Sequence, residues 1–170
     1  MDVWFVSDQH FGHENMLKFT KEDGSPVRPE FTSVQDMNEY MIARHNEKIG
    51  QSTKVYFLGD VAFKLDIFHS IMPRLNGKKR LILGNHDKFS MTEYLKYFEK
   101  IYESWQPVRN VLFTHRPIHM GDHHGKVQFN CHGHTHYRII NDPRYLNLCV
   151  ENWDYSPVHW SKIQKELKLS

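Results

Sequence analysis

Residues 55–60 read Val-Tyr-Phe-Leu-Gly-Asp, a continuous apolar run that ends in a glycine and a carboxylate. Four apolar residues without polar alternation are typical of a strand that is covered on both faces, as in a parallel sheet. Similar runs occur at residues 3–8, which end in Ser-Asp, and at residues 80–87, which end in Gly-Asn-His-Asp. The three runs therefore predict three buried strands, each with polar residues at its carboxyl end.

Helices are predicted where apolar residues recur at helical spacing between cap and stop signals. The segments are residues 13–19, 34–48, 63–75 with a bend at Pro73, 90–100, and 161–168. Further strands are expected at residues 101–106, 110–113, 127–131 and 146–150, and a surface loop at residues 20–32. Strand and helix alternate in the first half and strands dominate the second, which predicts a single layered α/β domain with mixed sheets over residues 1–170.

The composition is that of an ordinary globular domain. With 39% hydrophobic and 25% charged residues, the 170-residue chain can bury one core. A net charge of +2 without a basic stripe argues against a nucleic-acid-binding protein. No apolar stretch suits a signal peptide or a membrane span, and Cys131 and Cys149 form no spaced pair, so we expect free thiols and a cytoplasmic protein. The oligomeric state stays open.

Short acid, amide and histidine clusters recur where the predicted strands end. They are Asp8-Gln9-His10, Gly59-Asp60, Gly84-Asn85-His86-Asp87, Thr114-His115 and His132-Gly133-His134-Thr135-His136. Seven of the 13 histidines lie between Thr114 and Tyr137, dispersed among other residues as in a built site and unlike a terminal tag. Because open α/β sheets bind ligands at the carboxyl ends of their strands, the five clusters are expected to converge.

Each cluster alone would be an ordinary turn, and only their combination indicates chemistry. In Asp8-x-His10 and in His134-x-His136, an extended backbone would place both side chains of a pair on one side. Carboxylate, imidazole and amide groups in this number suit two divalent cations, which activate a water and clamp a phosphoryl group. The set therefore predicts a two-metal hydrolase, with one histidine left over for chemistry.

The ordered set resembles the signature of the calcineurin-like metallophosphoesterase superfamily, which is D-x-H, G-D, G-N-H-[DE], H and G-H-x-H. Every part stands in this order in the chain, and the resemblance extends from Asp2 to about Leu167. Residues 7–15, Ser-Asp-Gln-His-Phe-Gly-His-Glu-Asn, resemble a small group of bacterial and phage phosphoesterases. The resemblance implies a layered α-β-β-α sandwich of two mixed β-sheets flanked by helices, the metallo-dependent phosphatase type of fold.

The resemblance also implies a role for each motif residue. One metal ion would be held by Asp8, His10, Asp60 and His136, and the second by Asp60, Asn85, His115 and His134. Asp60 would bridge the two ions at a separation of about 3.5–4 Å. A hydroxide between them would attack phosphorus in line with the leaving group, which His86 would assist. Manganese is the expected metal, with iron, nickel, cobalt and zinc as alternatives.

Three further residues are candidate substrate contacts. His13 precedes a predicted helix whose free amides could meet an anion, and helix capping is its alternative role. Asp87 could orient its neighbour His86, and Arg116 follows a predicted ligand. The expected substrate is a small phosphodiester of nucleotide type, with a phosphomonoester as the alternative.

Two other classes of protein stay open. A binding scaffold with this fold would hold metal without catalysis, although the presence of His86 favours an enzyme. A metallo-β-lactamase-type hydrolase needs an H-x-H-x-D-H run, which residues 132–136 do not continue. Protein Ser/Thr phosphatases follow the second motif with a further Asp and an Arg, whereas residues 59–63 read Gly-Asp-Val-Ala-Phe, so protein dephosphorylation is not expected.

Overall fold

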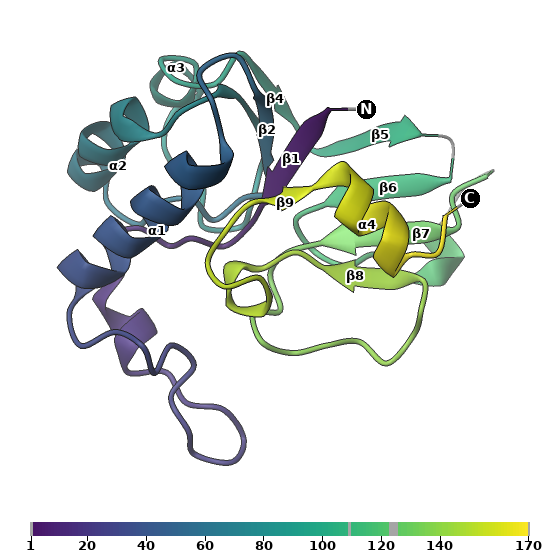
Figure 1. Cartoon of the computed structure of the whole chain (residues 1–170), viewed down its shortest axis with the longest axis horizontal. Coiled ribbons are helices and arrows are strands. Elements are labelled where there is room, and N and C mark those ends of the chain that lie inside the picture. Colours follow the sequence, from purple (N-terminus) through teal and green to yellow (C-terminus); the bar gives the residue numbers. More distant parts are fainter. Residues whose placement is uncertain (1, 109, 123–125, 170) are drawn as a thin grey trace.

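The computed structural model describes residues 2–108, 110–122 and 126–169, and its first sheet has the strand order β4-β3-β2-β1-β9 (Figure 1). These strands are β4 (Lys100–Tyr102), β3 (Lys78–Ile82), β2 (Lys54–Phe57), β1 (Val3–Val6) and β9 (Val158–His159). The first four are parallel, and β9 pairs with β1 in antiparallel register. The three predicted buried strands are therefore neighbours, and their carboxyl ends meet at one edge.

The second sheet has the order β5-β6-β7-β8 and is also mixed. Its strands are β5 (Ser104–Val108), β6 (Val111–Thr114), β7 (Phe129–His132) and β8 (Tyr145–Asn147). β5 runs antiparallel to β6, whereas β6, β7 and β8 are parallel. β6 and β7 deliver the fourth and fifth predicted clusters, His115 and residues 132–136, at their carboxyl ends.

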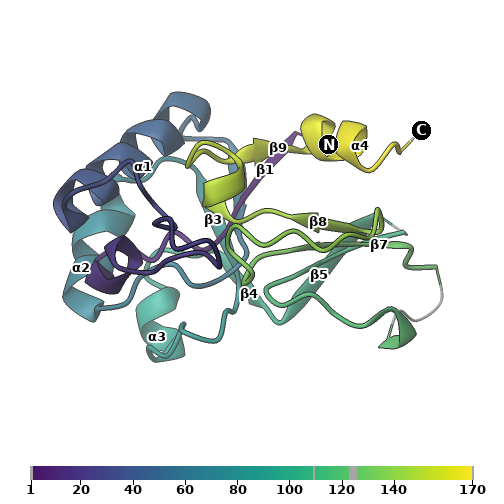
Figure 2. The ribbon, with the colours of Figure 1, turned by 90° about the horizontal axis from the view of Figure 1, so that it is seen from below.

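Helices flank the two sheets. They are α1 (Val34–Lys48), α2 (Leu65–Ile71), α3 (Met91–Tyr94) and α4 (Trp160–Glu166), with short 3₁₀ helices η1 (Glu14–Leu17), η2 (Met72–Arg74), η3 (Met120–Asp122) and η4 (Val150–Asn152). Figure 2 shows α1, α2 and α3 on one side of the first sheet and the second sheet on its other side. The expected α/β class with two mixed sheets flanked by helices is thus confirmed.

Two apolar cores follow from the alternation of side chains along each strand. On one face of the first sheet, Val6 and Phe57 pack with residues of α1 and α2. On the other face, Phe5 stacks on Phe113 of the second sheet with ring centroids 4.2 Å apart, and Tyr56 stacks on Trp105 at 3.9 Å. Both faces of β1 and β2 are covered, as their unbroken apolar runs predict.

Two predicted elements differ clearly from the structure, and one strand was not predicted. The helix predicted over residues 90–100 covers only Met91–Tyr94, and β4 begins at Lys100. The Ser90 hydroxyl bonds Thr92 and makes no capping bond to the helix. The strand predicted over residues 101–106 is two strands, β4 and β5, which belong to different sheets. Strand β9 has only two residues and was not predicted, since no pattern can identify so short a strand.

Two expectations about the chain's environment can be compared with the structure. Among the described residues, every helix is too short or too polar to cross a bilayer. Cys131 and Cys149 are both buried free thiols, as expected.

Candidate metal centre

The predicted ligands lie on turns with unusual backbone conformations. Asp8, His10 and Asp60 have φ angles of 60°, 51° and 53°, and His134 and His136 have φ angles of 70° and 51°. The expectation that Asp8-x-His10 and His134-x-His136 are extended is therefore wrong, because all four residues adopt the left-handed region. Non-glycine residues in this region carry strain of about 1–3 kcal/mol each, and such strain is concentrated at functional sites.

The Asp87 carboxylate holds two of these turns together. It accepts hydrogen bonds from the backbone amides of Asp60 at 2.8 Å, Gly84 at 2.8 Å and Val61 at 3.2 Å. Burial raises the pKa of Asp87 above its usual value, although the bonds to Gly84 and Val61 oppose that effect. With its oxygens engaged in this way, Asp87 supports the turns. Its contacts do not support the two predicted roles, which were to contact the substrate and to orient His86.

Close packing around the turns explains two of the motif glycines. A Cβ at Gly84 would lie 2.2 Å from Asp60 Oδ1, and a Cβ at Gly133 would lie 2.3 Å from Asp8 Oδ2. Any side chain at either position would displace a predicted ligand. These glycines therefore allow backbone to lie directly against a carboxylate.

One set of converging side chains consists of Asp8, His10 and His136, here called the Asp8 cluster. His10 Nε2 lies 3.7 Å from Asp8 Oδ1, and His136 Nε2 lies 4.0 Å from the same oxygen. Asp8 Oδ1 and His10 Nε2 are buried and have no hydrogen-bond partner among the described residues. Buried polar atoms are nearly always paired, so these two atoms fit a site that could hold a cation.

The second set consists of Asp60, His115 and His134, here called the Asp60 cluster. Asp60 Oδ2 lies 3.5 Å from His115 Nε2 and also 3.5 Å from His10 Nε2 of the Asp8 cluster. The predicted ligand Asn85 joins this set, since its Oδ1 lies 3.0 Å from His115 Nε2. One carboxylate oxygen therefore faces both clusters.

Hydrogen bonds behind the rings decide which nitrogen of each histidine faces the clusters. His115 Nδ1 donates to the Leu58 carbonyl at 2.7 Å, which leaves Nε2 to face Asp60. His136 Nδ1 donates to Glu151 Oε1 at 2.9 Å, which leaves Nε2 to face Asp8. Such bonds fix the tautomer and the ring orientation of metal-ligating histidines.

Arg28 and Glu151 belong to the site, and the sequence did not predict either of them. The Arg28 side chain is almost fully buried and donates to Glu151 Oε1 at 2.9 and 2.7 Å. It also donates to the carbonyls of Asp8 at 2.7 Å and Gln9 at 2.8 Å. Arg28 thereby connects the first motif to the support of His136, although its segment was predicted as a surface loop.

The charges in this network shift several pKa values. Burial raises the pKa of Glu151, but the Arg28 charge and the bond from His136 lower it overall. Burial lowers the pKa of His136, but the bond to Glu151 and the charges of Glu151 and Asp8 outweigh it and raise the pKa. At His134, burial and the positive charges of His115 and Arg116 all lower the pKa. Glu151 therefore stays ionised and keeps a proton on His136 Nδ1.

The predicted catalytic histidine lies beside the clusters without joining either. His86 is exposed, its ring centroid lies 5.7 Å from that of His10, and its backbone amide donates to Asp60 Oδ1 at 2.8 Å. The His13 ring stacks on Phe63 with centroids 4.0 Å apart and lies 5.5 Å from the His10 ring. His13 stands at the N-cap position of η1, where its carbonyl accepts a bond from the Met16 amide at 3.0 Å, but its side chain makes no capping bond.

The remaining predicted residues lie near the site with weaker connections. Arg116 is exposed and directly follows His115 of the Asp60 cluster in the chain, and its charge contributes to the lowered pKa of His134. His132 is buried behind the site, and its Nδ1 donates to the Gly133 carbonyl at 2.8 Å. His123 and His124, two of the crowded histidines, lie outside the described residues.

Solved structures and curated proteins resemble this chain over nearly its full length. A crystal structure of AQ665, a protein of unknown function from Aquifex aeolicus, superposes with a TM-score of 0.72 and 23% identity, covering 96% of this chain and 97% of that one. That likeness shows the fold alone. The Gene 66 protein of Mycobacterium phage D29 is 28% identical over 89% of this chain and 89% of its own length.

No family model matches the chain. The uncharacterized protein MJ1445 of Methanocaldococcus jannaschii is 30% identical over an alignment of 176 positions, gaps included, which covers 96% of this chain and 89% of that protein. Similarity at this level, over most of the length of both sequences, indicates common descent. This chain therefore belongs to the same family as the uncharacterized protein MJ1445.

Proposed function

We propose that this protein is a two-metal phosphoesterase of the calcineurin-like metallophosphoesterase superfamily, with the layered α-β-β-α fold of that group. Its expected substrates are phosphodiesters of nucleotide type. The observation that carries the proposal is the position of Asp60 Oδ2, which lies 3.5 Å from a histidine nitrogen of each cluster. A carboxylate oxygen shared in this way suits a pair of cations better than a single one.

The residues present fit two divalent cations. Asp8, His10, Asp60 and His136 would hold one, and Asp60, Asn85, His115 and His134 the other. Imidazole, carboxylate and amide donors suit manganese and the neighbouring first-row metals, and availability decides among them. When bound, the two cations would activate a water for attack on phosphorus and neutralise charge on the phosphoryl oxygens.

The chain's own residues account for the remaining steps. His86 is exposed and lies beside His10, so its imidazole can reach an oxygen that leaves the phosphorus and give it a proton. In the overall hydrolysis, a water oxygen bonds to phosphorus, the bond from phosphorus to the leaving oxygen breaks, and that oxygen takes a proton. Arg116 and His13 flank the site and are proposed to contact the phosphoryl group.

A turnover assay on metal-stripped and metal-restored protein tests this function. The panel contains 4-nitrophenyl phosphate, bis(4-nitrophenyl) phosphate and a cyclic nucleotide. Chelation should abolish hydrolysis, and manganese should restore it, with the diesters preferred. Hydrolysis that persists unchanged in chelator would exclude the two-metal mechanism. Protein that binds two metal ions but hydrolyses no panel member would instead be a metal-binding scaffold.

A further inference from the structure

A hollow of about 350 Å³ adjoins the candidate metal centre and is not used by the mechanism above. It lies between two segments far apart in the chain, residues 16–27 and residues 134–138. Its walls include His134 of the Asp60 cluster and His136 of the Asp8 cluster. A group bound there would therefore be directly connected to whatever is bound at the two clusters.

The lining of this hollow includes buried apolar side chains and exposed aromatic ones beside its polar residues. Met16 and Val27 are 1% and 7% exposed, whereas Phe19 is 47% exposed. The Tyr137 ring completes the wall beside His136. A volume of this size lies within the range of small-molecule sites, and apolar walls with aromatic rings favour a flat organic group.

Contacts between the two segments hold the hollow open before any ligand binds. Glu22 accepts hydrogen bonds from Tyr137 Oη at 2.8 Å and from Arg138 Nε at 2.9 Å. Within the first segment, the Val27 amide donates to the Phe19 carbonyl at 2.8 Å, and the next residue is the buried Arg28. Exposed ion pairs contribute little alone, so the buried Arg28 network is the main anchor of this wall.

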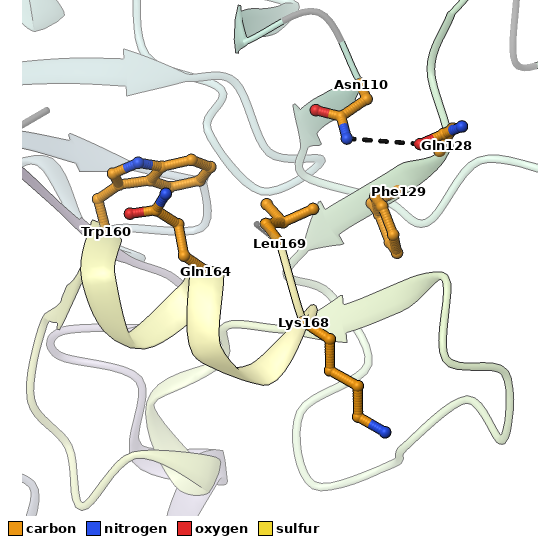
Figure 3. A pocket seen from close by; sticks show the side chains of 7 residues that line it. All are labelled: Asn110, Gln128, Phe129, Trp160, Gln164, Lys168 and Leu169. Atoms are coloured by element: carbon orange, nitrogen blue, oxygen red, sulfur yellow. Dashed lines mark hydrogen bonds between the residues drawn. The ribbon is translucent and has the colours of Figure 1, made fainter.

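A second hollow of about 310 Å³ provides a contrast (Figure 3). Trp160 and Gln164 of α4 and Phe129 of β7 line it, with the Asn110–Gln128 hydrogen bond at its edge. Among the residues that the structure describes, none of its lining residues belongs to either cluster. It has no connection to the chemistry and carries no proposal.

We propose that the hollow beside His134 and His136 binds the flat aromatic part of the phosphoester substrate, such as an aryl ring or a nucleobase. This inference rests on the proposed function. The bound group is the ester substituent that stays on phosphorus, because His86, which would protonate the leaving group, is not among the described lining residues. The hollow thus selects substrates by a group that the reaction does not remove.

Diesters that share a 4-nitrophenyl leaving group test the inference. The metal-loaded protein is assayed with methyl, phenyl and thymidine-5′ 4-nitrophenyl phosphates. The phenyl and thymidine esters should have kcat/KM values about 10-fold or more above that of the methyl ester, mainly through lower KM. Phe19→Ala should reduce this preference about 10-fold. The matched control is Ile139→Ala, because Ile139 is an apolar side chain close in sequence that is 67% exposed. It should leave the preference unchanged.

A binding measurement keeps the inference separate from the proposed function. Phenylphosphonate should bind the metal-loaded protein about 10-fold tighter than methylphosphonate, and Phe19→Ala should remove most of that difference. If no ester is hydrolysed but this binding preference holds, only the proposed function fails. The inference is overturned if the esters are hydrolysed with no preference for phenyl over methyl. It is also overturned if Phe19→Ala lowers kcat/KM equally for the phenyl and methyl esters, because the hollow then has no role in recognition.

Discussion

The Asp8 cluster and the Asp60 cluster use the same kinds of ligand but are supported in different ways. Side chains provide much of the support of the first: Asp8 Oδ2 accepts bonds from the neighbouring Ser7 Oγ at 2.5 Å and from the distant Cys149 Sγ at 3.3 Å, besides the His134 amide at 2.8 Å, and Glu151 holds His136. Backbone groups contact the second directly, since Leu58 O fixes His115 and the His86 amide fixes Asp60, while the Asp87 carboxylate holds the Asp60 turn. His136 in the first cluster therefore depends on a remote side chain, whereas His115 and Asp60 in the second are bonded by backbone groups.

This difference has a consequence for how the two halves respond to mutation. A change at a remote side chain, such as Glu151, should weaken the Asp8 cluster and spare the Asp60 cluster. The Asp60 cluster should change when its own ligands change, or when Asp87, which holds the Asp60 turn, is replaced, because other substitutions leave the backbone carbonyls and amides in place. Asp60 is the exception, since Oδ2 faces both sides. Four variants, ordered by their expected effect on metal binding, test this comparison.

Asp60→Asn should have the largest effect, because it removes the charge that both clusters share. We expect the affinity for both ions to fall by about 100-fold or more, since a lost carboxylate removes both a ligand and its charge. Metal content after dialysis, measured by mass spectrometry, checks this result. Asp66→Asn, an exposed acid on α2, is the matched control and should retain both ions. Full retention of either ion in Asp60→Asn would contradict the bridging position.

Glu151→Gln should affect one cluster only. The amide can still accept the His136 hydrogen bond but no longer carries the charge that favours it, so affinity at the Asp8 cluster should fall by about 10–100-fold. In a calorimetric titration with Mn²⁺, the ion at the Asp60 cluster should keep its wild-type affinity, and the ion at the Asp8 cluster should bind more weakly. Glu22→Gln, which removes an exposed partner of Arg138, is the control. Equal weakening of both ions would show that the clusters are not supported separately.

Glu151→Gln should also lower the stability of the metal-free protein. It leaves the buried Arg28 guanidinium without its anionic partner, and breaking a buried pair of this kind costs about 3–5 kcal/mol. Denaturant unfolding of the metal-free variant measures this cost independently of metal binding. An unchanged midpoint would mean that Arg28 is satisfied by the carbonyls of Asp8 and Gln9 alone.

Asn85→Ala should weaken metal binding at the Asp60 cluster and not at the Asp8 cluster, the reverse of Glu151→Gln, and the effect should be smaller. It removes one neutral oxygen from the Asp60 cluster, so we expect about a 10-fold loss of affinity there and none at the Asp8 cluster. The same Mn²⁺ titration detects it, and Asn46→Ala, an amide remote from the clusters that bonds the Arg74 carbonyl, serves as the control. Loss of affinity at both positions would indicate that the second ion depends on the first.

The convergence of the proposed ligands was predictable from the sequence because motif residues follow apolar strands. Asp8, Asp60 and His115 follow β1, β2 and β6, and parallel strands place such positions at one edge. The left-handed turns were not predictable, because Asp8 and His10 adopt a backbone conformation that glycine usually provides. The sequence pattern indicates which residues meet but not the backbone path that brings them together.

The support of the Asp8 cluster could not be predicted for a different reason. Arg28 and Glu151 are 123 positions apart, and each stands in a segment without a motif. Arg28 follows a proline-containing turn that is typical of an exposed loop, and arginine is rarely buried unless it is paired. Only the folded chain identifies its partner. Side-chain support from distant positions is thus the part of the site that sequence patterns do not contain.

His86→Ala should have the smallest effect on metal binding, because His86 belongs to neither cluster. Its contact with Asp60 is made by the backbone amide, which alanine retains, so both ions should bind as in the wild type. Turnover should nevertheless fall by about 10²–10⁴-fold for esters with an alkoxide leaving group, which needs a proton, and by less for 4-nitrophenolate, which does not. The two leaving groups therefore act as internal controls for each other. An equal loss with both would assign His86 to holding the phosphoryl group and would remove its role as a proton donor.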